Sequence, residues 1–538
     1  MSAPTATLRR PWWSGVLLLT AAVLLLRVVL QGLLWPLELA ADEAHYWDWS
    51  RRPALSYHTK GPWVAWMIGL SVELLGSSEL GVRFPAYLAS AVASFAAGAL
   101  GAALSGGNPR AASGAALALQ AISALQVSGS LMTVDMQMVA GWLGGTALAA
   151  WALARAEAGR PIAVLLAGAG LCFAQAFLAK YTALLGALGV FLALWRAPAL
   201  RGHAQRVRGL ACYLGLLGLG ALPVLWWNAR HDWATLRHLA LHLEAGGAGS
   251  GAGFDWRWPL GYLGMTLGAA GPPQALVVLG ALRWSLSAGA RSAENAAGLR
   301  LCLWSALPVL LFYLLVSCAA PTEGNWALGA YGPLAVLASE WLRRGPAEHA
   351  ALRRRLGRIA AGFGALTALS VLTLPPAARA LEPALAPLGV RLPLYRVSGQ
   401  RAFALEVRGR VRQTWAALAL PGQPDAAPLI ADYYSRAALL AFYTPGHPPV
   451  RCASARLMAR PSAYDDFADT RWPDPALLGQ PLVLVGQAAE RWRSAFQLEI
   501  LAELGSATES GRQRPLLLAR LVALEPPPPT SPAAPGGR

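Results

Sequence analysis

Charged residues are scarce in this chain of 538 residues. Asp, Glu, Lys and Arg together make up 14% of it, whereas roughly 25% is usual for a soluble domain. Hydrophobic residues account for 55% of the sequence. This composition excludes an ordinary soluble globular protein and predicts a mainly α-helical, polytopic membrane protein.

Cysteine is also rare, and the five cysteines lie far apart in the sequence. Their spacing contains neither a disulfide framework nor a CxxC metal site. The net charge of +17 would suit a protein that binds nucleic acid. The arginines, however, stand in short clusters between apolar runs, which is the pattern of topology signals in membrane proteins. We therefore do not expect nucleic-acid binding.

Lysine is the rarest basic residue. Among the 45 basic residues there are only two lysines, Lys60 and Lys180. Because arginine supplies positive charge everywhere else, the two lysines indicate a need for a compact ammonium group. A phosphate held by a point charge is one such need, and chance placement is the alternative.

Long apolar runs predict about eleven transmembrane helices. The first run, Pro11 to Leu37, is interrupted by Arg27 and Gln31 and is too long for the core of a signal peptide. The other runs lie at about 82–104, 112–131, 136–154, 161–179, 182–195, 209–227, 258–282, 301–319, 325–342 and 357–374. The shorter run Pro62 to Leu75 is expected to form an amphipathic helix on the membrane surface.

The distribution of basic residues predicts the orientation. Basic residues are more frequent in the loops on the side of the membrane where the N-terminus is placed. The positive-inside rule identifies that side as cytoplasmic. With an odd number of spans, the C-terminal part is then periplasmic, in a bacterial inner membrane. We expect a transmembrane domain at 1–376, a small α/β domain at 377–524 and a disordered, proline-rich tail at 525–538.

The predicted α/β domain contains strand-like stretches, PLIADYY and PLVLVGQ, and helical patterns near 400–417 and 435–443. Two roles are open for this domain. It is either a packing lid without direct chemistry or a surface that recognises the acceptor.

Ionisable residues gather immediately after the first span, in the stretch ADEAHYWDWSRRPALSYHTK at 41–60. A membrane protein rarely places so many beside a span without a chemical reason. Candidate site residues in this stretch are Asp42, Glu43, His45, Tyr57, His58 and Lys60. Further candidates in later turns on the same predicted side are Arg83, Asp135, Lys180, Asn228, Glu323 and Asn325.

Alternative roles are open for several candidates. Asp135 could be the N-cap of the following helix, or a carboxylate that faces a cavity shared with Asp42 and binds a metal or an acceptor hydroxyl, and the two roles can coexist. The turns WNARHDW and TEGNW, which carry Asn228, Glu323 and Asn325, are either interfacial structure or parts of a substrate site. His45 is by default a hydrogen-bonding histidine, as is His58.

A divalent metal, Mg or Mn, is a further possibility. Asp42, Glu43, His45 and Asp135 could supply oxygen and nitrogen ligands, although their spacing matches no strict metal signature.

Several ordered motifs resemble the bacterial protein-mannosyltransferase-like glycosyltransferases. These are C-type (GT-C) membrane enzymes, which include the dolichyl-phosphate-mannose protein mannosyltransferases and the aminoarabinose transferase that modifies lipid A. Three motifs resemble the first outer loop of this family: ADEAHYWDWS, SYHTKGPWVAW and SSELGVRFPA. The later landmarks are LMTVDMQM, LAKYTALLGA, PVLWWNARHDW and PTEGNWA, and the resemblance covers about residues 1–345.

The resemblance implies a GT-C fold, an active site at the outer leaflet, a sugar donor on polyprenyl phosphate and inversion at the anomeric carbon. The acceptor would be a lipid, a protein or a glycan. The family's catalytic carboxylate maps onto Asp42, with Glu43 beside it. The family's lysine-proline-proline reads Lys60, Gly61 and Pro62 in this sequence, which implies a looser turn.

The chemistry of such a transfer assigns the remaining roles. A hydroxyl nucleophile needs a base, for which Asp42 is the candidate. The leaving phosphate needs cations, for which Lys60, Lys180 and Arg83 are the candidates. We therefore expect the acid and the two lysines to converge around a lipid-borne phosphosugar at one membrane surface.

Two rival functions remain open. An O-antigen ligase or polymerase would share a lipid-linked donor and an outer site. A transporter or flippase would place its buried charges near the bilayer midplane, whereas in this chain they gather at one face.

Overall fold

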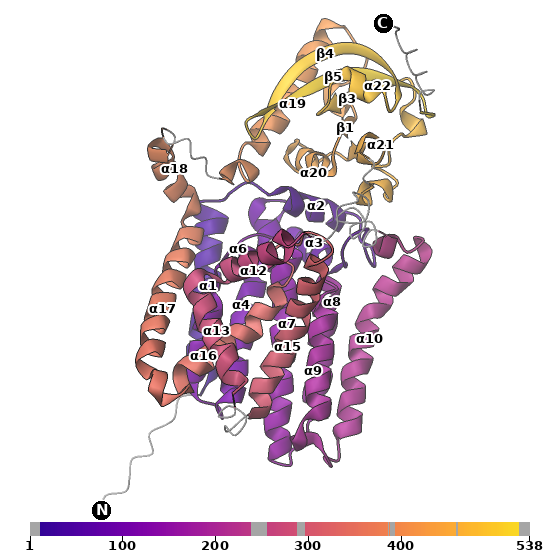
Figure 1. Cartoon of the computed structure of the whole chain (residues 1–538). Coiled ribbons are helices and arrows are strands. Elements are labelled where there is room, and N and C mark those ends of the chain that lie inside the picture. Colours follow the sequence, from indigo (N-terminus) through magenta and orange to yellow (C-terminus); the bar gives the residue numbers. More distant parts are fainter. Residues whose placement is uncertain are drawn as a thin grey trace, which may run out of the picture. The chain divides into compact units, whose positions relative to one another are not determined.

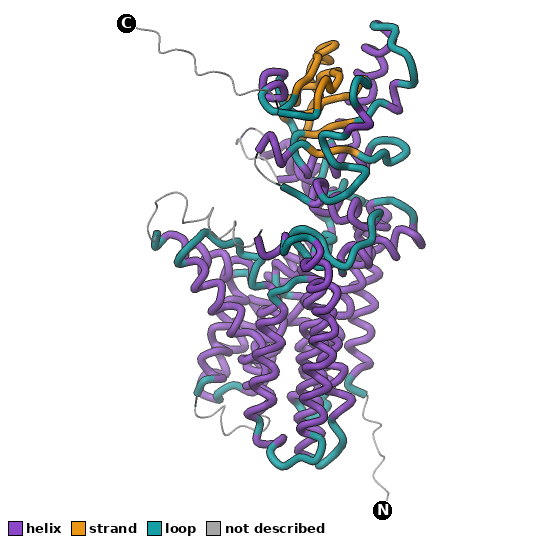
Figure 2. Tube along the Cα trace, turned by 90° about the vertical axis from the view of Figure 1, so that its right-hand side faces the viewer, coloured by secondary structure: helices purple, strands orange, loops and turns teal. Residues whose placement is uncertain are grey.

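The computed structural model describes residues 11–237, 255–287, 296–385, 387, 393–458 and 461–526. The basic head at 1–10 and nearly all of the predicted tail at 525–538 lie outside these residues. Two compact units are present. We call Met1–Pro36 with Pro53–Leu381 the membrane unit, and Leu37–Arg52 with Glu382–Arg538 the C-terminal unit. The described strands all belong to the C-terminal unit (Figure 2).

The regular secondary structure that is described in the membrane unit is helical (Figure 1). Because long apolar stretches must satisfy their backbone groups internally, helices are the expected form. The main helices are α1 (Trp13–Leu26), η1 (Arg27–Leu34), α3 (Trp63–Leu75), α4 (Glu79–Leu104), α5 (Pro109–Gln120), α6 (Ser123–Ser128), α7 (Val134–Glu157), α8 (Ala163–Ala179), α9 (Ala183–Arg196), α10 (Arg206–Arg230), α12 (Arg257–Ala270), α13 (Pro272–Ser285), α15 (Ala296–Ser317), α16 (Tyr331–Arg344) and α17 (Ala350–Leu372). Helix α18 (Leu374–Leu385) follows α17 and reaches the C-terminal unit along the chain.

Five of the described helices are long and apolar enough to cross a membrane by themselves. They are Trp13–Leu34, Glu79–Leu104, Arg206–Arg230, Ala296–Ser317 and Ala347–Leu372. The mainly α-helical, membrane-embedded character predicted from composition is therefore confirmed. The run predicted at 258–282 is instead two helices, α12 and α13, that meet at 103°. Gly271 forms this corner with a φ of +97°, a backbone conformation that glycine adopts without strain.

The two polar residues of the first span are part of a buried polar cluster. Arg27 is 1% exposed and donates hydrogen bonds to the side chains of Gln126 and Ser130. The amide of Gln31 also donates to Ser130, at 3.1 Å, and to the carbonyl of Val371, at 3.0 Å. Polar groups in a membrane need such partners, so this cluster joins the first span to α6 and α17.

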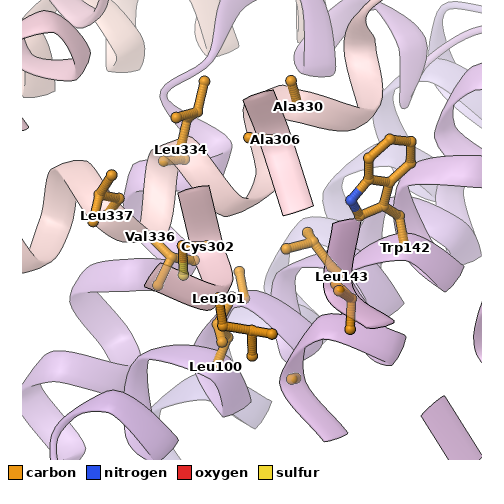
Figure 3. Packing of buried hydrophobic residues seen from close by; sticks show 14 of the residues in the cluster. Leu100, Trp142, Leu143, Leu301, Cys302, Ala306, Ala330, Leu334, Val336 and Leu337 are labelled. Atoms are coloured by element: carbon orange, nitrogen blue, oxygen red, sulfur yellow. The ribbon is translucent and has the colours of Figure 1, made fainter. Parts of the chain in front are cut away.

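Trp142 of α7 belongs to the buried hydrophobic core of the membrane unit (Figure 3). Its ring nitrogen donates to Oγ of Ser305 on α15 at 2.8 Å. A Cβ on Gly186 of α9 would lie 2.0 Å from the Trp142 ring, and one on Gly329, in the turn before α16, would lie 2.4 Å from it. Glycine at these two positions therefore allows α9 and this turn to pack against the ring. This close packing makes the unit a rigid support for the turns at the helix ends.

The C-terminal unit contains a five-stranded sheet in the order β2-β1-β3-β5-β4. The strands are β1 (Leu429–Ala431), β2 (Val450–Cys452), β3 (Pro481–Val485), β4 (Gln497–Glu509) and β5 (Arg512–Ala523). The first three are parallel, and β5 pairs antiparallel with both β3 and β4. Its main helices are α19 (Gln400–Ala417), α20 (Tyr434–Tyr443) and α22 (Ala489–Arg493).

The predicted small α/β domain is therefore present. The stretches PLIADYY and PLVLVGQ form β1 and β3, and the two helical patterns form α19 and α20. The β4–β5 hairpin was not predicted. Its turn has the positive φ angles of Ser510 and Gly511, which are typical of a two-residue hairpin turn.

Candidate functional site

The stretch with the most ionisable residues begins as a helix, α2 (Ala41–Ser50). Glu43 stabilises its first turn, because its Oε2 accepts a hydrogen bond from the backbone N–H of Ala40 at 2.8 Å. The Glu43 side chain is fully buried. This carboxylate therefore satisfies a free N–H group at the helix start.

Helix α2 is packed as part of the C-terminal unit. Residues 43–49 are all buried, whereas Asp42 is exposed. The indole of Trp47 meets the ring of Phe442 edge to face, with centroids 4.9 Å apart. The sequence analysis placed these residues in the transmembrane domain, but their large aromatic side chains are buried against α20. Asp42 therefore lies at the start of a helix whose other side chains are packed in place.

His45 is a structural histidine in this arrangement. Its Nε2 accepts a hydrogen bond from the indole N–H of Trp49 at 3.0 Å, and its ring stacks on Tyr464. Burial lowers the pKa of His45 to about 3. It is therefore neutral at physiological pH, which agrees with its default interpretation as a hydrogen-bonding residue.

In the membrane unit, Lys180 and Asp135 form a buried ion pair. Lys180 Nζ lies 2.7 Å from Asp135 Oδ1, and the two residues are 8% and 5% exposed. Lys180 ends α8, and Asp135 lies in the first turn of α7. A buried pair of this kind is seldom kept for stability alone, so it is a candidate for a functional charge.

The N-cap of α7 is Thr133, whose Oγ1 accepts a hydrogen bond from the backbone N–H of Asp135 at 3.4 Å. The prediction of Asp135 as this N-cap is therefore wrong. Since the threonine two positions earlier has extended backbone and supplies the capping oxygen, the Asp135 carboxylate is left to bind Lys180.

Asn325 completes a cluster of three polar residues. The backbone carbonyl of Asn325 accepts a hydrogen bond from Lys180 Nζ at 3.3 Å. The side-chain Nδ2 of Asn325 lies 3.5 Å from Asp135 Oδ2. The side chain is exposed. All three residues were candidates from the sequence, each on its own. In the structure they meet at the start of α7, the end of α8 and the turn before α16. We call them the Lys180 cluster.

An apolar groove adjoins the Lys180 cluster. It has a volume of about 510 Å³, and Asn325 lies in its wall. The other lining residues, from α6, α12 and the turn before α16, are Ala124, Val127, Ser128, Met265, Gly268, Ala269, Gly324 and Leu328. The groove is therefore an apolar surface that meets the Lys180 cluster at Asn325.

The segment that carries Lys60 packs against the turn that carries Lys180. A Cβ placed on Gly61 would lie 2.0 Å from the carbonyl oxygen of Leu178, so these two backbones touch. Next to this contact, the hydroxyl groups of Ser56 and Tyr181 are 2.9 Å apart. The expected looser turn at Gly61 is therefore wrong, because glycine at this position permits a closer approach than any other residue.

We expect Gly61→Ala to destabilise the protein. The added Cβ would overlap a backbone atom, and overpacking typically costs about 1–3 kcal/mol. The measurement is the melting temperature of the purified protein in detergent, with Gly218→Ala as control, because a Cβ at Gly218 of α10 meets nothing within 4 Å. A melting temperature as high as that of the control would contradict this account of the contact.

The remaining candidates near Lys60 are also packed in the membrane unit. Tyr57 is 1% exposed, and its hydroxyl accepts a hydrogen bond from the backbone of Ala54 at 3.3 Å. His58 is half-buried. Arg83 is 3% exposed and lies near the start of α4.

Two side chains that were not predicted as site residues, those of Gln137 and Tyr181, form hydrogen bonds that link these turns. Gln137 accepts from the indole N–H of Trp63 at 3.3 Å and donates to the carbonyl of Pro85 at 2.8 Å. Tyr181 bonds to Ser56, and burial raises the pKa of Tyr181 to about 12. Both lie within one or two residues of a predicted site residue, in LMTVDMQM and LAKYT, which was the available signal.

Asn228 has a local structural role. Its Nδ2 donates to the carbonyl of Val224 at 3.0 Å, and its Oδ1 accepts from the backbone of Thr235 at 3.1 Å. Both ends of the amide thus hold the turn after α10. Glu323 is exposed in the turn that also carries Asn325.

Among the residues that the structure describes, no group of three or more His, Cys, Asp or Glu side chains is arranged to hold a metal ion.

Comparison with known proteins gives consistent matches. Residues 59–227 match the family model described as dolichyl-phosphate-mannose-protein mannosyltransferase. The lipid A galacturonosyltransferase RgtD of Rhizobium johnstonii is 28% identical over 302 residues, which are 56% of this chain. The chain spans 60% of the length of that relative.

Solved structures of low sequence identity match over most of the chain. ArnT from Cupriavidus metallidurans bound to undecaprenyl phosphate has a TM-score of 0.60 at 14% identity, covering 96% of this chain and 99% of that chain. The archaeal oligosaccharyltransferase AglB from Archaeoglobus fulgidus, in complex with an inhibitory peptide and a dolichol-phosphate, has a TM-score of 0.50 at 12% identity, covering 88% and 69%. At these identities the likeness concerns the fold.

Proposed function

We propose that this chain is a GT-C membrane glycosyltransferase of the protein-mannosyltransferase-like and ArnT-like family, and that it transfers a monosaccharide from a polyprenyl-phosphate donor to lipid A; the family-model match, the galacturonosyltransferase relative and the ArnT-like fold support this. The Lys180 cluster beside the apolar groove is the observation that carries this proposal. A polyprenyl-phosphate sugar needs both an apolar surface for its chain and a cation for its phosphate. The lipid A relative supports the choice of acceptor.

The proposed role of Lys180 is to bind the donor phosphate. When the glycosidic bond breaks, the phosphate gains negative charge, and a fixed ammonium group stabilises that charge. Asp135 and Asn325 hold Lys180 at 2.7 and 3.3 Å, which limits its motion before substrate binds. Lys60 is proposed as a second phosphate ligand, on a backbone segment packed against the Lys180 turn.

The proposed role of Asp42 is that of general base. A sugar hydroxyl is a weak nucleophile at neutral pH, and a carboxylate that removes its proton during attack typically contributes 10²- to 10⁴-fold. Asp42 is exposed at the first turn of α2, whereas Glu43 beside it is buried and caps the helix. Of the acidic pair, we therefore propose Asp42, which is exposed, as the base.

The reaction balances without a further reactant. The acceptor oxygen forms a bond to the anomeric carbon, the bond from that carbon to the phosphate oxygen breaks, and the proton passes to the base. Polyprenyl phosphate leaves with the bonding electrons. We propose that this takes place in a bacterial inner membrane with the C-terminal unit in the periplasm.

The test is transfer by the purified protein with defined substrates. We expect sugar transfer from synthetic undecaprenyl-phosphate monosaccharides to lipid A, with mass spectrometry showing the added residue. The donors should include uronic acid, aminopentose and neutral hexose forms, and an acceptor peptide should be assayed in parallel. Transfer only from diphosphate-linked oligosaccharides would instead support a ligase, and transfer only to peptide would overturn the lipid A proposal.

A further inference from the structure

The C-terminal unit contacts the α2 segment at three places, before the helix, along it and after it, although the contacting residues lie far from α2 in the sequence. From these contacts we infer that the C-terminal unit positions Asp42, and that Tyr443, Arg52 and Asp469 are its positioning residues. This inference rests on the proposed role of Asp42. It assigns to the unit a function other than a lid or an acceptor surface.

The first contact fixes the backbone before α2. The backbone N–H of Leu39 donates to the hydroxyl of Tyr443 at 2.6 Å, and the backbone N–H of Glu38 donates to the carbonyl of Val397 at 3.0 Å. The Glu38 carboxylate in turn accepts from the backbone of Gln400. Tyr443 ends α20 and is 4% exposed. The chain is therefore held three residues before Asp42.

The second contact fixes the rotation of the helix about its axis. The His45 ring stacks on Tyr464 with an interplanar angle of 9°, and its centroid lies 4.8 Å from that of Tyr434. Trp47 packs on Phe442. Asp42 precedes His45 by three residues, so the two side chains leave the helix on the same side, and Asp42 is exposed whereas residues 43–49 are buried.

The third contact fixes the end of the segment. Arg52 donates from Nε and Nη2 to the two carboxylate oxygens of Asp469, at 2.7 and 2.6 Å. Its Nη1 donates to Oδ1 of Asp48, at 2.8 Å. The Asp48 side chain is fully buried. A bidentate pair specifies direction as well as distance, so Arg52 orients the last turn of α2 relative to the domain.

These three contacts hold the backbone before α2, its buried side chains and the end of the segment, and Asp42 is exposed in the first turn of the same helix. A carboxylate that must meet a hydroxyl within hydrogen-bond reach depends on such support. A displacement of about 1 Å caused by a distant change can lower a rate by about 10²-fold. Loss of one anchor should therefore lower the rate of transfer more than it lowers binding of the donor.

The C-terminal unit offers a matched control for the Arg52–Asp469 pair. Arg412 and Asp425 form the same bidentate pair, with both distances 2.8 Å. The Asp425 and Asp469 side chains are each 52% exposed. Arg412 belongs to α19 rather than to the α2 segment. The two pairs thus share their geometry and the exposure of the aspartate, whereas Arg52 is 14% and Arg412 57% exposed, and they differ in whether they hold α2.

The experiment compares Asp469→Asn with Asp425→Asn in the full-length protein. We expect Asp469→Asn to lower kcat by about 10-fold with the KM for the donor unchanged, and Asp425→Asn to stay within about 2-fold of wild type. Tyr443→Phe removes the bond to Leu39 and should also lower kcat. Melting temperatures of all variants show whether each one is folded.

The outcomes separate the inference from the proposed function. Equal effects of Asp469→Asn and Asp425→Asn, or an unchanged kcat in both Asp469→Asn and Tyr443→Phe, would overturn positioning by this unit. A rise in KM without loss of kcat would also overturn it. A wild-type protein without transfer activity, or an active Asp42→Asn variant, would instead remove the proposed function on which the inference rests.

Discussion

Replacing Lys180 by methionine should lower sugar transfer by about 10³-fold. An ammonium about 4 Å from a phosphate contributes roughly 4 kcal/mol at an effective dielectric constant near 20, and each 1.36 kcal/mol changes a rate tenfold. Methionine keeps much of the side-chain volume but lacks the charge. The measurement is kcat/KM with a polyprenyl-phosphate sugar.

Lys180→Met alone would leave the buried Asp135 without its cation, so a folding defect has to be distinguished from lost chemistry. Removing one partner of a buried ion pair costs about 3–5 kcal/mol. The double variant Lys180→Met with Asp135→Asn removes both charges of the pair and should recover the melting temperature. If it also recovered transfer, Lys180 would have only a structural role.

Replacing Asp42 by asparagine should lower kcat by 10²- to 10⁴-fold, the range that general-base catalysis usually contributes. Asparagine has the same shape but cannot accept the hydroxyl proton. Because Asp42 is exposed, we expect the protein to fold as before. The measurement is single-turnover transfer together with the melting temperature.

Glu490 provides a close control for this variant. It is an exposed acidic residue at the second position of α22, as Asp42 is of α2, and both helices belong to the C-terminal unit. Each substitution therefore removes one charge from a helix N-terminus, worth about 0.3–1 kcal/mol. Glu490→Gln should keep full activity. Transfer by Asp42→Asn at the level of this control would contradict its role as the base.

The membrane character of the chain and several polar candidates could be predicted from the sequence because they depend on local composition. Apolar runs must form helices in a membrane, and polar turns beside them are visible as short interruptions. Asp135, Lys180 and Asn325 were each identified in this way. Their mutual contacts could not be predicted from the sequence alone, because they depend on how α7, α8 and the turn before α16 pack.

The errors have similar physical causes. The cap of α7 was one of the two roles open for Asp135, but Thr133 offers an equally suitable oxygen and takes that place. Gly61 was expected to loosen a turn, whereas it permits contact with the Leu178 backbone. The membership of α2 in the C-terminal unit also depends on partners far away in the sequence. Periodicity within one segment contains no information on such partners.

The bond between Leu39 and Tyr443 joins residues 404 positions apart. During synthesis, the ribosome therefore makes the first span and the acidic helix long before it makes the surface on which that helix packs. A nascent or truncated chain that ends before α20 would contain Asp42 but would lack Phe442, Tyr443 and Asp469, which hold α2 in the full chain. Under the proposed role of Asp42, sugar transfer would then begin only after the chain has been translated past Asp469.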